Sequence, residues 1–372
     1  MNLLIAAVSS ATGPSGICRH AYNLARCAIR RTEIKQVALV VGKWQALYFH
    51  NLFRLENAKV LIIPVDISNK ALARNFWYLH GLPKLIEELR VDVLHLSFPV
   101  PIHKTAIRCP IVASLHDLYP YDEPDNFGFP KVLFNRMLLQ QCLGEADCIA
   151  CVSETTLSRL RARFPRVAHR KALVIHNCVT IQCCDSKTPF CGQHHYLLMV
   201  AQHRANKNIL LALEAFDQLL CSGILPKETL LILVGNQGPE TRKIRNTIKR
   251  RLLRKNVKLI MEISDEELKW LYKNCDLLIA PSLTEGFGLP VVEALLCGSR
   301  VVCSDISAFR EIGGEACQYF DLHAESVFLT MKVAICRALE QPARSLPQLE
   351  KFSLEHATEK YAALYTQLRS EL

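Results

Sequence analysis

The stretch PSLTEGFGLPVVE, residues 281–293, places Glu285 and Glu293 on either side of a Gly-Phe-Gly-Leu-Pro turn. A strand-like run, DLLIAP, leads into the turn and a helix-like run, VVEALLC, follows it. Glycines let backbone approach a ligand closely, and the free N–H groups at a helix start favour phosphate. Carboxylates accept hydrogen bonds from neighbouring hydroxyls. The stretch therefore predicts a polyol and phosphate site at a strand-to-helix crossover, with Glu293 on the first helical turn. The alternative is an ordinary glycine turn with two surface glutamates.

Strand-like apolar runs alternate with helical periodicity along the first half of the chain. Continuous apolar runs are typical of strands that are covered on both faces, and the alternation indicates βαβ units with a parallel sheet. We expect strands at residues 3–8, 37–41, 60–63, 91–96, 111–115, 148–152 and 172–175, and helices at 18–30, 77–89 and 134–143.

A polar stretch at residues 181–195 interrupts this pattern and is interpreted as a linker. A second complete strand and helix series then begins at Tyr196 and contains a basic helix at 240–253. We expect an α/β protein with two doubly wound Rossmann-like domains, at 1–180 and 196–350, and an interdomain cleft. A C-terminal helix within residues 351–372 is expected to pack back on the first domain.

Half of the 372 residues are apolar, and this length is ample for two hydrophobic cores. The 16 cysteines lie mostly in apolar runs, as small core residues do, so reduced thiols are expected rather than disulfides. The spacings of Cys148/Cys151 and Cys183/Cys184 do not combine into a zinc pattern. We therefore expect no metal site.

The N-terminal run MNLLIAAVSS lacks a basic leader, so a buried first strand is favoured over a signal peptide. No run approaches the length of a membrane span, which predicts a soluble or peripheral protein. The net charge is +10, with basic clusters at 159–163, 169–171 and 242–255. These are either solvated helix faces or a surface that is attracted to an anionic membrane or acceptor. Nucleic acid is not expected, because aromatic residues do not interleave with the basic runs.

The stretch at 281–298, PSLTEGFGLPVVEALLCG, with the following VVCSDISAFREIGGEACQYFD, resembles the signature of group 1 glycosyltransferases. These are the family-4 retaining enzymes of the GT-B fold, and two glutamates separated by seven residues are their hallmark. The resemblance covers the second domain almost fully and the first more thinly. It implies that Glu293 holds the nucleotide ribose, that Glu285 contacts the donor sugar, and that the amides of the turn meet the diphosphate and hexose. The turn residues concerned are Gly286, Phe287, Gly288 and Leu289.

The same resemblance implies roles for residues outside this turn. Lys207 matches a lysine that clamps the diphosphate, although it could be the solvated start of a helix. The family's second cation is missing at Gln202, and Arg204 is a substitute candidate. Gly16 follows the first strand and is implied to approach the diphosphate, or else belongs to an ordinary turn. His116 is implied to lie near the reacting face of the donor sugar, or else is a structural histidine at a strand end.

Other polar positions carry weaker expectations. His95, His103 and His176 are interpreted as structural residues at strand edges. The stretch after Asp117, with its aromatic and acidic residues, is either an acceptor-lining loop or a surface loop. Ser153 is expected to cap a helix, and Asn208 is a further cap candidate. Ser282 and Thr284 are expected beside the donor site.

The expected reaction is transfer of a hexosyl group, preferably mannosyl, from a GDP- or UDP-sugar to an acceptor hydroxyl, with His116, Glu285 and Lys207 as candidate catalytic residues. Stabilisation of the diphosphate leaving group by cations and amides would supply most of the catalysis. The resemblance implies retention. No DxD motif is present, so neither a metal nor another cofactor is expected. The basic surface and the HDLYPYDEP stretch resemble cytoplasmic bacterial enzymes that build surface polysaccharide or lipopolysaccharide on a lipid carrier, resting on the inner membrane face.

Three alternatives remain open from the residues. They are a GT-B enzyme of other chemistry such as a sugar-nucleotide epimerase or phosphorylase, a non-catalytic sugar-nucleotide-binding protein, and a dinucleotide oxidoreductase. An incomplete glycine fingerprint disfavours the last of these. The sequence does not determine the donor base, the hexose, the acceptor and its linkage, or the oligomeric state.

Overall fold

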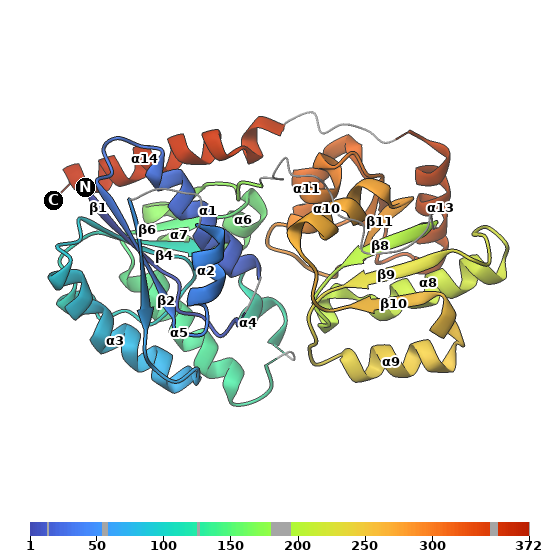
Figure 1. Cartoon of the computed structure of the whole chain (residues 1–372), viewed down its shortest axis with the longest axis horizontal. Helices are drawn as coiled ribbons and strands as arrows, with labels where there is room; N and C mark the ends of the chain where they lie inside the picture. Colours follow the sequence, from blue (N-terminus) through green and yellow to red (C-terminus); the bar gives the residue numbers. More distant parts are fainter. Residues whose placement is uncertain (13–14, 54–58, 125–126, 180–194, 343–348, 372) are drawn as a thin grey trace. The chain divides into compact units, whose positions relative to one another are not determined.

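The structure is a computed structural model that describes residues 1–12, 15–53, 59–124, 127–179, 195–342 and 349–371. The chain divides into two compact units (Figure 1). Unit 1 comprises Met1–Cys178 with Glu350–Leu372, and unit 2 comprises Val179–Leu349. Of the linker expected at 181–195, only His195 lies within the described residues.

Unit 1 is built on a seven-stranded sheet with the order β3-β2-β1-β4-β5-β6-β7. All of its neighbouring strands are parallel, so each connection crosses over a face of the sheet. The direction of winding changes between β1 and β4, which is the doubly wound arrangement that the alternating pattern predicts. The strands are β1 Asn2–Ala6, β2 Gln36–Gly42, β3 Val60–Val65, β4 Val93–Leu96, β5 Ile111–Leu115, β6 Cys148–Cys151 and β7 Ala172–Val174.

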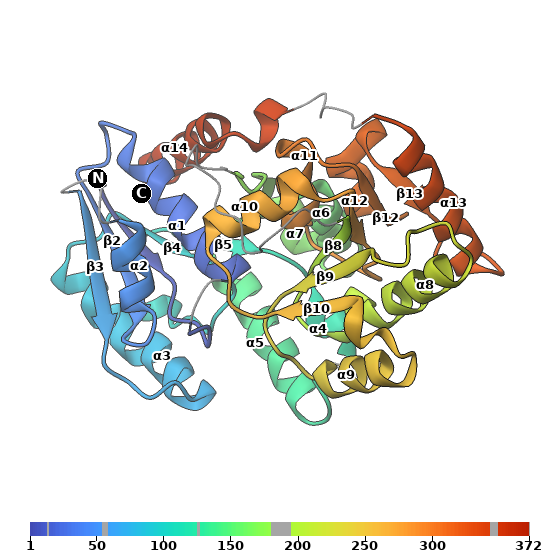
Figure 2. The same ribbon diagram turned by 45° about the vertical axis from the view of Figure 1, so that its right-hand side comes forward.

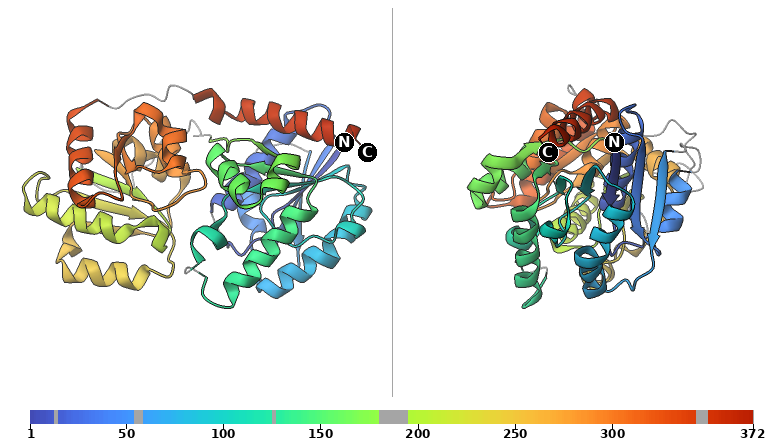
Figure 3. Two further views of the ribbon diagram at one scale, coloured as in Figure 1. Left: turned by 180° about the vertical axis from the view of Figure 1, so that it is seen from behind. Right: turned by 90° about the vertical axis from the view of Figure 1, so that its left-hand side faces the viewer.

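Helices cover both faces of this sheet because successive side chains of a buried strand point in opposite directions. In β1, Leu3 and Ile5 belong to one core and Leu4 and Ala6 to the other. Figure 3 shows the sheet and its helices from behind. The helices of unit 1 are α1 Gly16–Ile29, α2 Ala46–Leu52, α3 Ala71–Glu88, α4 Tyr119–Asp122, α5 Lys131–Glu145, α6 Glu154–Arg163, α7 Pro165–Lys171 and α14 Leu354–Ser370, with the short 3-10 helices η1 Lys104–Ala106 and η6 Leu349–Phe352.

The C-terminal helix α14 packs along α1 in unit 1, as Figures 1 and 2 both show. Its buried face contributes Leu354, Tyr361 and Tyr365 to the core that also contains β1 and α1. An exposed ion pair between Arg30 and Glu355 lies at the edge of this contact. The residues that follow unit 2 in the chain therefore complete the core of unit 1.

Unit 2 repeats the architecture with a six-stranded parallel sheet of order β10-β9-β8-β11-β12-β13. The winding changes between β8 and β11. Figure 2 shows this sheet with α8 and α9 beside it. The strands are β8 Tyr196–Val200, β9 Leu230–Val234, β10 Val257–Ile260, β11 Leu277–Ala280, β12 Val301–Ser304 and β13 Gln318–Phe320; the helices are α8 Ile209–Cys221, α9 Thr241–Arg250, α10 Asp265–Asn274, α11 Leu289–Leu296, α12 Ser307–Gly313 and α13 Val327–Glu340, with η3 Ala205–Lys207, η4 Leu253–Lys255 and η5 Gly314–Ala316.

Two expected elements differ from the structure. The basic helix expected at 240–253 ends at Arg250, because Leu252 adopts a left-handed backbone conformation and a 3-10 turn follows. The stretch after Asp117, expected as a loop, contains the helical turn α4. No helix among the described residues is long and apolar enough to cross a membrane.

Of the cysteines singled out in apolar runs, Cys148, Cys151 and Cys303 are buried. Cys275 and Cys297 are intermediate. The pair Cys183/Cys184 lies outside the described residues.

Candidate active site

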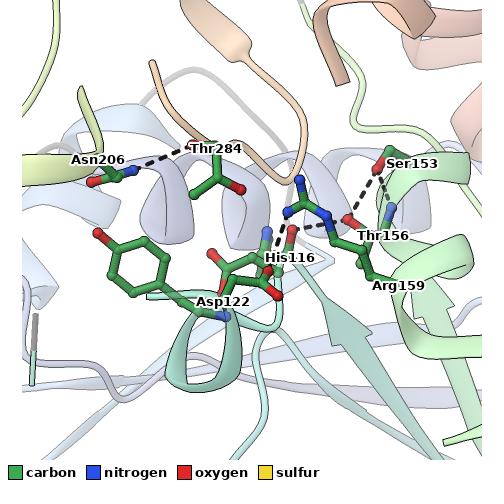
Figure 4. Close-up of polar contacts among 9 residues, drawn as sticks. His116, Asp122, Ser153, Thr156, Arg159, Asn206 and Thr284 are labelled. Atoms are coloured by element: carbon green, nitrogen blue, oxygen red, sulfur yellow. Dashed lines mark hydrogen bonds and ion pairs between the residues drawn. The ribbon is translucent and has the colours of Figure 1, made fainter. Parts of the chain in front are cut away.

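The loops after β8 and β11 lie together at the carboxyl edge of the unit 2 sheet. These strands are neighbours at the point where the winding changes, which is where doubly wound sheets bind ligands. The backbone N–H of Leu283 donates to the carbonyl of Asn206 at 2.8 Å, and the Asn206 side chain donates to the Thr284 carbonyl at 3.4 Å (Figure 4). The backbone contact and the amide side chain thus fix the two loops to each other.

Lys207 and Glu285 form an ion pair across these loops. Lys207 Nζ lies 2.5 Å from Glu285 Oε1, and the Ser282 hydroxyl donates to the same oxygen at 2.7 Å. The side chains are only 22% and 14% exposed, so the pair is poorly screened by solvent. Lys207 ends the 3-10 turn η3, directly before the cap residue of α8, and its side chain is ion-paired and mostly buried, which does not favour the interpretation of a solvated helix start. Asn208 takes the cap position in a left-handed conformation, but its side chain makes no cap hydrogen bond.

The glycine turn ends at Gly288, the residue that precedes α11. Its φ of 107° is a left-handed conformation that side chains disfavour, and an added Cβ would lie 2.8 Å from Phe309 and 2.9 Å from Ile312. Phe287 is buried beneath the turn, whereas Gly286 and Leu289 are half-buried. Pro290 within the first turn lacks an N–H, so the amides at the start of α11 come from the residues around Gly288 and Leu289.

Glu293 is the fifth residue of α11, so the expectation that it lies on the first helical turn is wrong. The helix begins at Leu289, directly after the glycine turn. The Glu293 side chain is buried, and its Oε2 accepts a hydrogen bond of 2.8 Å from the hydroxyl of Tyr272 in α10. A buried carboxylate needs such partners, and Tyr272 orients this one.

The residues just before η3 include Gln202, where the family's second cation is missing, and Arg204, the substitute candidate. Gln202 and Arg204 are both exposed, and Arg204 is the cap residue of η3. Between them, His203 is fully buried, and its Nδ1 lies 3.0 Å from the Thr241 hydroxyl.

In unit 1, His116 directly follows β5 and is half-buried. Its Nε2 lies 2.8 Å from the carbonyl oxygen of Ser97, and its ring packs edge-to-face on His20 with the ring centres 4.6 Å apart. A carbonyl only accepts, so Nε2 carries the proton, and Nδ1 of the neutral ring is the basic nitrogen. Burial lowers the pKa of His116, against the opposing effects of the Ser97 carbonyl and Asp117.

The backbone at His116 is held by α6. The Thr156 hydroxyl donates to the His116 carbonyl at 3.2 Å, and Ser153 caps α6 by accepting from the Thr156 N–H at 2.9 Å (Figure 4). The capping expectation for Ser153 is therefore confirmed.

Gly16 is the first residue of α1 and is exposed. The Ser15 side chain caps this helix by accepting from the Cys18 N–H at 3.2 Å. The Gly13 and Pro14 positions of the same turn lie outside the described residues.

Of the aromatic residues after Asp117, Tyr121 packs within unit 1. Tyr121 packs edge-to-face on Phe164, and the guanidinium groups of Arg136 and Arg163 lie over its ring. Asp122 pairs with Arg159 at 3.2 Å, and burial raises the pKa of this carboxyl despite the pairing (Figure 4). For Tyr121 these contacts favour a structural role over the acceptor-lining role.

Sequence reasoning missed several residues that support the site. Tyr272 positions Glu293, and Asn206 joins the two loops, yet neither residue lies in a motif. His95, interpreted from the sequence as a structural residue, lies one residue before the end of β4 and is fully buried. Among the described residues, no three His, Cys, Asp or Glu side chains are arranged to hold a metal ion.

Comparisons with known proteins agree with this geometry. Residues 185–318 match the model of "Glycosyl transferases group 1", and residues 14–182 match that of "Glycosyltransferase Family 4". The chain is 26% identical over 317 residues to an O-antigen chain mannosyltransferase, RfbU, of Salmonella typhimurium, covering 82% of each chain. It is 27% identical over 263 residues to the O-antigen chain mannosyltransferase B of Escherichia coli, covering 66% of this chain and 68% of that one.

Among solved structures, Anabaena HepE in complex with UDP-glucose superposes with a TM-score of 0.70 at 18% identity, covering 99% of this chain and 100% of that one. This likeness shows the fold. The two family models adjoin near the boundary between the units, and each covers most of one unit. The chain is a glycosyltransferase of the group 1, family 4 type with the GT-B fold.

Proposed function

We propose that this chain transfers a mannosyl group from a GDP- or UDP-linked sugar to a hydroxyl of a glycan or lipid-linked acceptor in bacterial surface polysaccharide synthesis. The observation that carries the proposal is the Lys207–Glu285 ion pair, which lies beside the glycine turn where the winding of the unit 2 sheet changes. The relatives named as O-antigen mannosyltransferases support the choice of sugar and of product class. The HepE complex with UDP-glucose supports a nucleotide-sugar donor.

The proposed donor site assigns each residue one task. Lys207 neutralises the diphosphate leaving group, and the amides of Gly286 to Leu289 hydrogen-bond to the phosphates and the hexose. Glu293, oriented by Tyr272, accepts hydrogen bonds from the ribose hydroxyls. Glu285 accepts from the sugar hydroxyls while Ser282 holds its carboxylate. Arg204 supplies a second positive charge from the exposed start of η3.

The proposed chemistry needs no resident metal or other cofactor. A lysine and preorganised amides stabilise the charge that develops on the leaving diphosphate, and in many enzymes such electrostatic stabilisation lowers the barrier more than any other effect. His116, neutral with a basic Nδ1, hydrogen-bonds to the sugar without adding charge. Gly16 at the start of α1 offers an exposed amide to the diphosphate or acceptor. The anomeric configuration of the product is expected to be retained.

A peripheral contact with an anionic membrane is part of the same proposal. Leu133 and Met137 share one face of α5 and are 51% and 56% exposed, and Phe129, just before the helix, is 83% exposed. Lys131 adds an exposed cation to this surface. Apolar side chains with flanking cations suit an interface with anionic lipid, placing the enzyme on the cytoplasmic membrane face.

The test is a donor screen that measures nucleoside diphosphate release with GDP-mannose, UDP-glucose, UDP-galactose and UDP-N-acetylglucosamine. A glycan primer and a lipid-linked primer serve as acceptors. We expect turnover with the mannosyl donor and an axial anomeric linkage in the product spectrum. Turnover of only a non-mannosyl donor would contradict the mannosyl assignment. Interconversion of the sugar nucleotide without transfer would identify the epimerase alternative.

A further inference from the structure

Five buried polar side chains of unit 1 form one continuous chain of hydrogen bonds. Tyr365 Oη lies 2.5 Å from His95 Nδ1, and His95 Nε2 lies 2.8 Å from Ser114 Oγ. Ser114 Oγ lies 2.8 Å from His20 Nε2, and His20 Nδ1 lies 2.8 Å from Asn177 Oδ1. All five residues are less than 9% exposed. The chain joins α14, β4, β5 and α1 to the segment after β7.

The direction of these hydrogen bonds follows from the Asn177 end. Asn177 Oδ1 only accepts, so His20 Nδ1 carries the proton and His20 Nε2 accepts from the Ser114 hydroxyl. Ser114 Oγ then accepts from His95 Nε2–H, and His95 Nδ1 accepts from the Tyr365 hydroxyl. Every ring nitrogen of the two histidines is satisfied when both rings are neutral.

Burial keeps both rings neutral. It lowers the pKa of His95 to about 3 and that of His20 well below its usual value. The two rings nevertheless have opposite tautomers, since His20 is protonated at Nδ1 and His95 at Nε2. With these tautomers His95 Nδ1 must accept a hydrogen bond, so the next residue in the series of hydrogen bonds has to be a donor. That donor is the hydroxyl of Tyr365 on α14.

The His20 end of the chain contacts the candidate catalytic histidine. The His20 ring, clamped at both nitrogens, packs edge-to-face on the ring of His116 at an interplanar angle of 86°. His116 itself is held at Nε2 by the Ser97 carbonyl. The hydrogen bond at Nε2 alone leaves the His116 ring free to tilt about that bond. Contact with the His20 ring limits this tilt.

We propose that the Tyr365–His95–Ser114–His20–Asn177 chain is a positioning device that fixes the orientation of the His116 ring, whose neutral Nε2–H tautomer is set by the Ser97 carbonyl. The proposal rests on the proposed function, in which His116 contacts the donor sugar. The proposal includes no proton transfer along these hydrogen bonds. Because Tyr365 lies on α14, the device is complete only when α14 has docked on unit 1.

The test compares Tyr365→Phe with Tyr78→Phe. Tyr78 is a matched control, since it is equally buried in unit 1 and its hydroxyl donates to the Val8 carbonyl at 3.1 Å without touching a histidine. Both variants lose one buried hydroxyl hydrogen bond, so similar losses of thermal stability are expected. The readouts are long-range ¹H–¹⁵N spectra of the ¹⁵N-histidine-labelled full chain, and kcat and KM for the donor.

In the wild type we expect His20 as the Nδ1–H tautomer and His95 and His116 as Nε2–H tautomers. Tyr365→Phe should alter the His95, His20 and His116 signals and lower kcat about fivefold, the equivalent of one net hydrogen bond, with little change in KM. Tyr78→Phe should leave the signals and kcat unchanged. Unchanged His116 signals in Tyr365→Phe, or equal kcat values for the two variants, would overturn the proposal.

The spectra separate this proposal from the proposed function. If the wild type turns over no nucleotide sugar, the proposed function fails. The response of the His116 signals to Tyr365→Phe still supports or overturns the positioning role in that case. If the wild type turns over the donor but the His116 signals do not respond, only the positioning device fails.

Discussion

Lys207 Nζ lies 2.5 Å from Glu285 Oε1, so an ion pair joins the loop after β8 to the loop after β11. The pair links Lys207, which is proposed to bind the diphosphate leaving group, to Glu285, which is proposed to bind the sugar. It also balances the charge of both groups when no ligand is bound. Breaking a partly buried pair leaves its partner uncompensated, so a variant of either residue is expected to lower stability in addition to removing the contact assigned to that residue.

Replacing Lys207 by methionine should weaken the binding of nucleoside diphosphate. Charge-assisted hydrogen bonds contribute about 1.5–3 kcal/mol, which corresponds to a loss of roughly 10- to 100-fold in affinity by calorimetry. Lys227→Met, at an exposed lysine of the same unit, is the control and should bind as the wild type does. An affinity equal to that of the control would contradict the assignment of Lys207.

Glu285→Gln should separate sugar transfer from nucleotide binding. The amide keeps the shape of the side chain and can still accept from Ser282, but it lacks the negative charge that faces Lys207. We expect a large loss of kcat with GDP or UDP affinity within about twofold of the wild type, because this residue is assigned to the sugar and not to the nucleotide. A matching loss of nucleotide affinity would place the role of Glu285 at the diphosphate.

Glu293→Ala should weaken nucleotide binding, because it removes the proposed acceptor for the ribose hydroxyls. Tyr272→Phe is the comparison, since it removes the 2.8 Å hydrogen bond that orients the carboxylate but keeps the carboxylate itself. We expect a loss of roughly 10-fold or more for Glu293→Ala and a smaller loss for Tyr272→Phe. Unchanged nucleoside diphosphate affinity in Glu293→Ala, measured by calorimetry, would exclude the ribose role.

Gly288→Ala should destabilise unit 2 more than Gly298→Ala does. Both glycines have positive φ angles, 107° and 80°, so alanine introduces backbone strain of about 1–2 kcal/mol at each. Only at Gly288 does the new Cβ meet other atoms, at 2.8 Å from Phe309, whereas nothing lies within 4 Å at Gly298. The clash should add about 1–3 kcal/mol in urea unfolding. Equal urea midpoints for the two variants would show that the glycine turn accommodates the alanine Cβ without an additional loss of stability.

Transfer activity should survive EDTA, because the proposed stabilisation of the leaving group uses Lys207 and backbone amides. The measurement is the initial rate of nucleoside diphosphate release before and after chelation and dialysis. Added Mg²⁺ or Mn²⁺ should change the rate by less than about twofold, since the proposed mechanism gives a metal ion no part in the reaction. A strict requirement for a divalent cation would refute the metal-free mechanism.

Acidification should destabilise unit 1 through its buried histidines. Burial lowers the pKa of His20, His95 and His116 in the folded chain, so below about pH 6.5 the unfolded chain binds protons that the folded chain does not. Stability is therefore full above this pH and falls as the pH drops through the window down to about 3, the folded pKa of His95. The limiting slope is about 1.4 kcal/mol per pH unit for each histidine.

Urea midpoints at about pH 7.5 and about pH 5.5 check this expectation, since carboxylates titrate mostly below that range. His323→Gln, at an exposed histidine of unit 2, should leave the pH dependence as it is in the wild type. A urea midpoint that does not change between the two pH values would show that lowering the pH through this range does not destabilise the folded chain through the three histidines.

The fold follows closely from local pattern. The expected strand at 111–115 is β5, and the helix-like run VVEALLC after the glycine turn forms most of α11, because continuous apolar strands and helices are encoded by neighbouring residues. The predicted end of the basic helix is wrong because it depends on one backbone conformation. Leu252 adopts a left-handed conformation, so the helix ends earlier than predicted. The predicted position of Glu293 on α11 is wrong because the helix starts directly after Gly288.

The doubly wound class follows from the alternation of apolar strands and helices along the chain, and the glycine turn between Glu285 and Glu293 and the cation Lys207 are each encoded in one short stretch. That Lys207 pairs with Glu285, 78 residues away, and that Tyr272 holds Glu293 depends on the folded arrangement of the chain. Only that arrangement brings Tyr365 to His95 across 270 residues. The physical reason is that strand order brings distant loops to one sheet edge, and side-chain hydrogen bonds form only after that packing is complete.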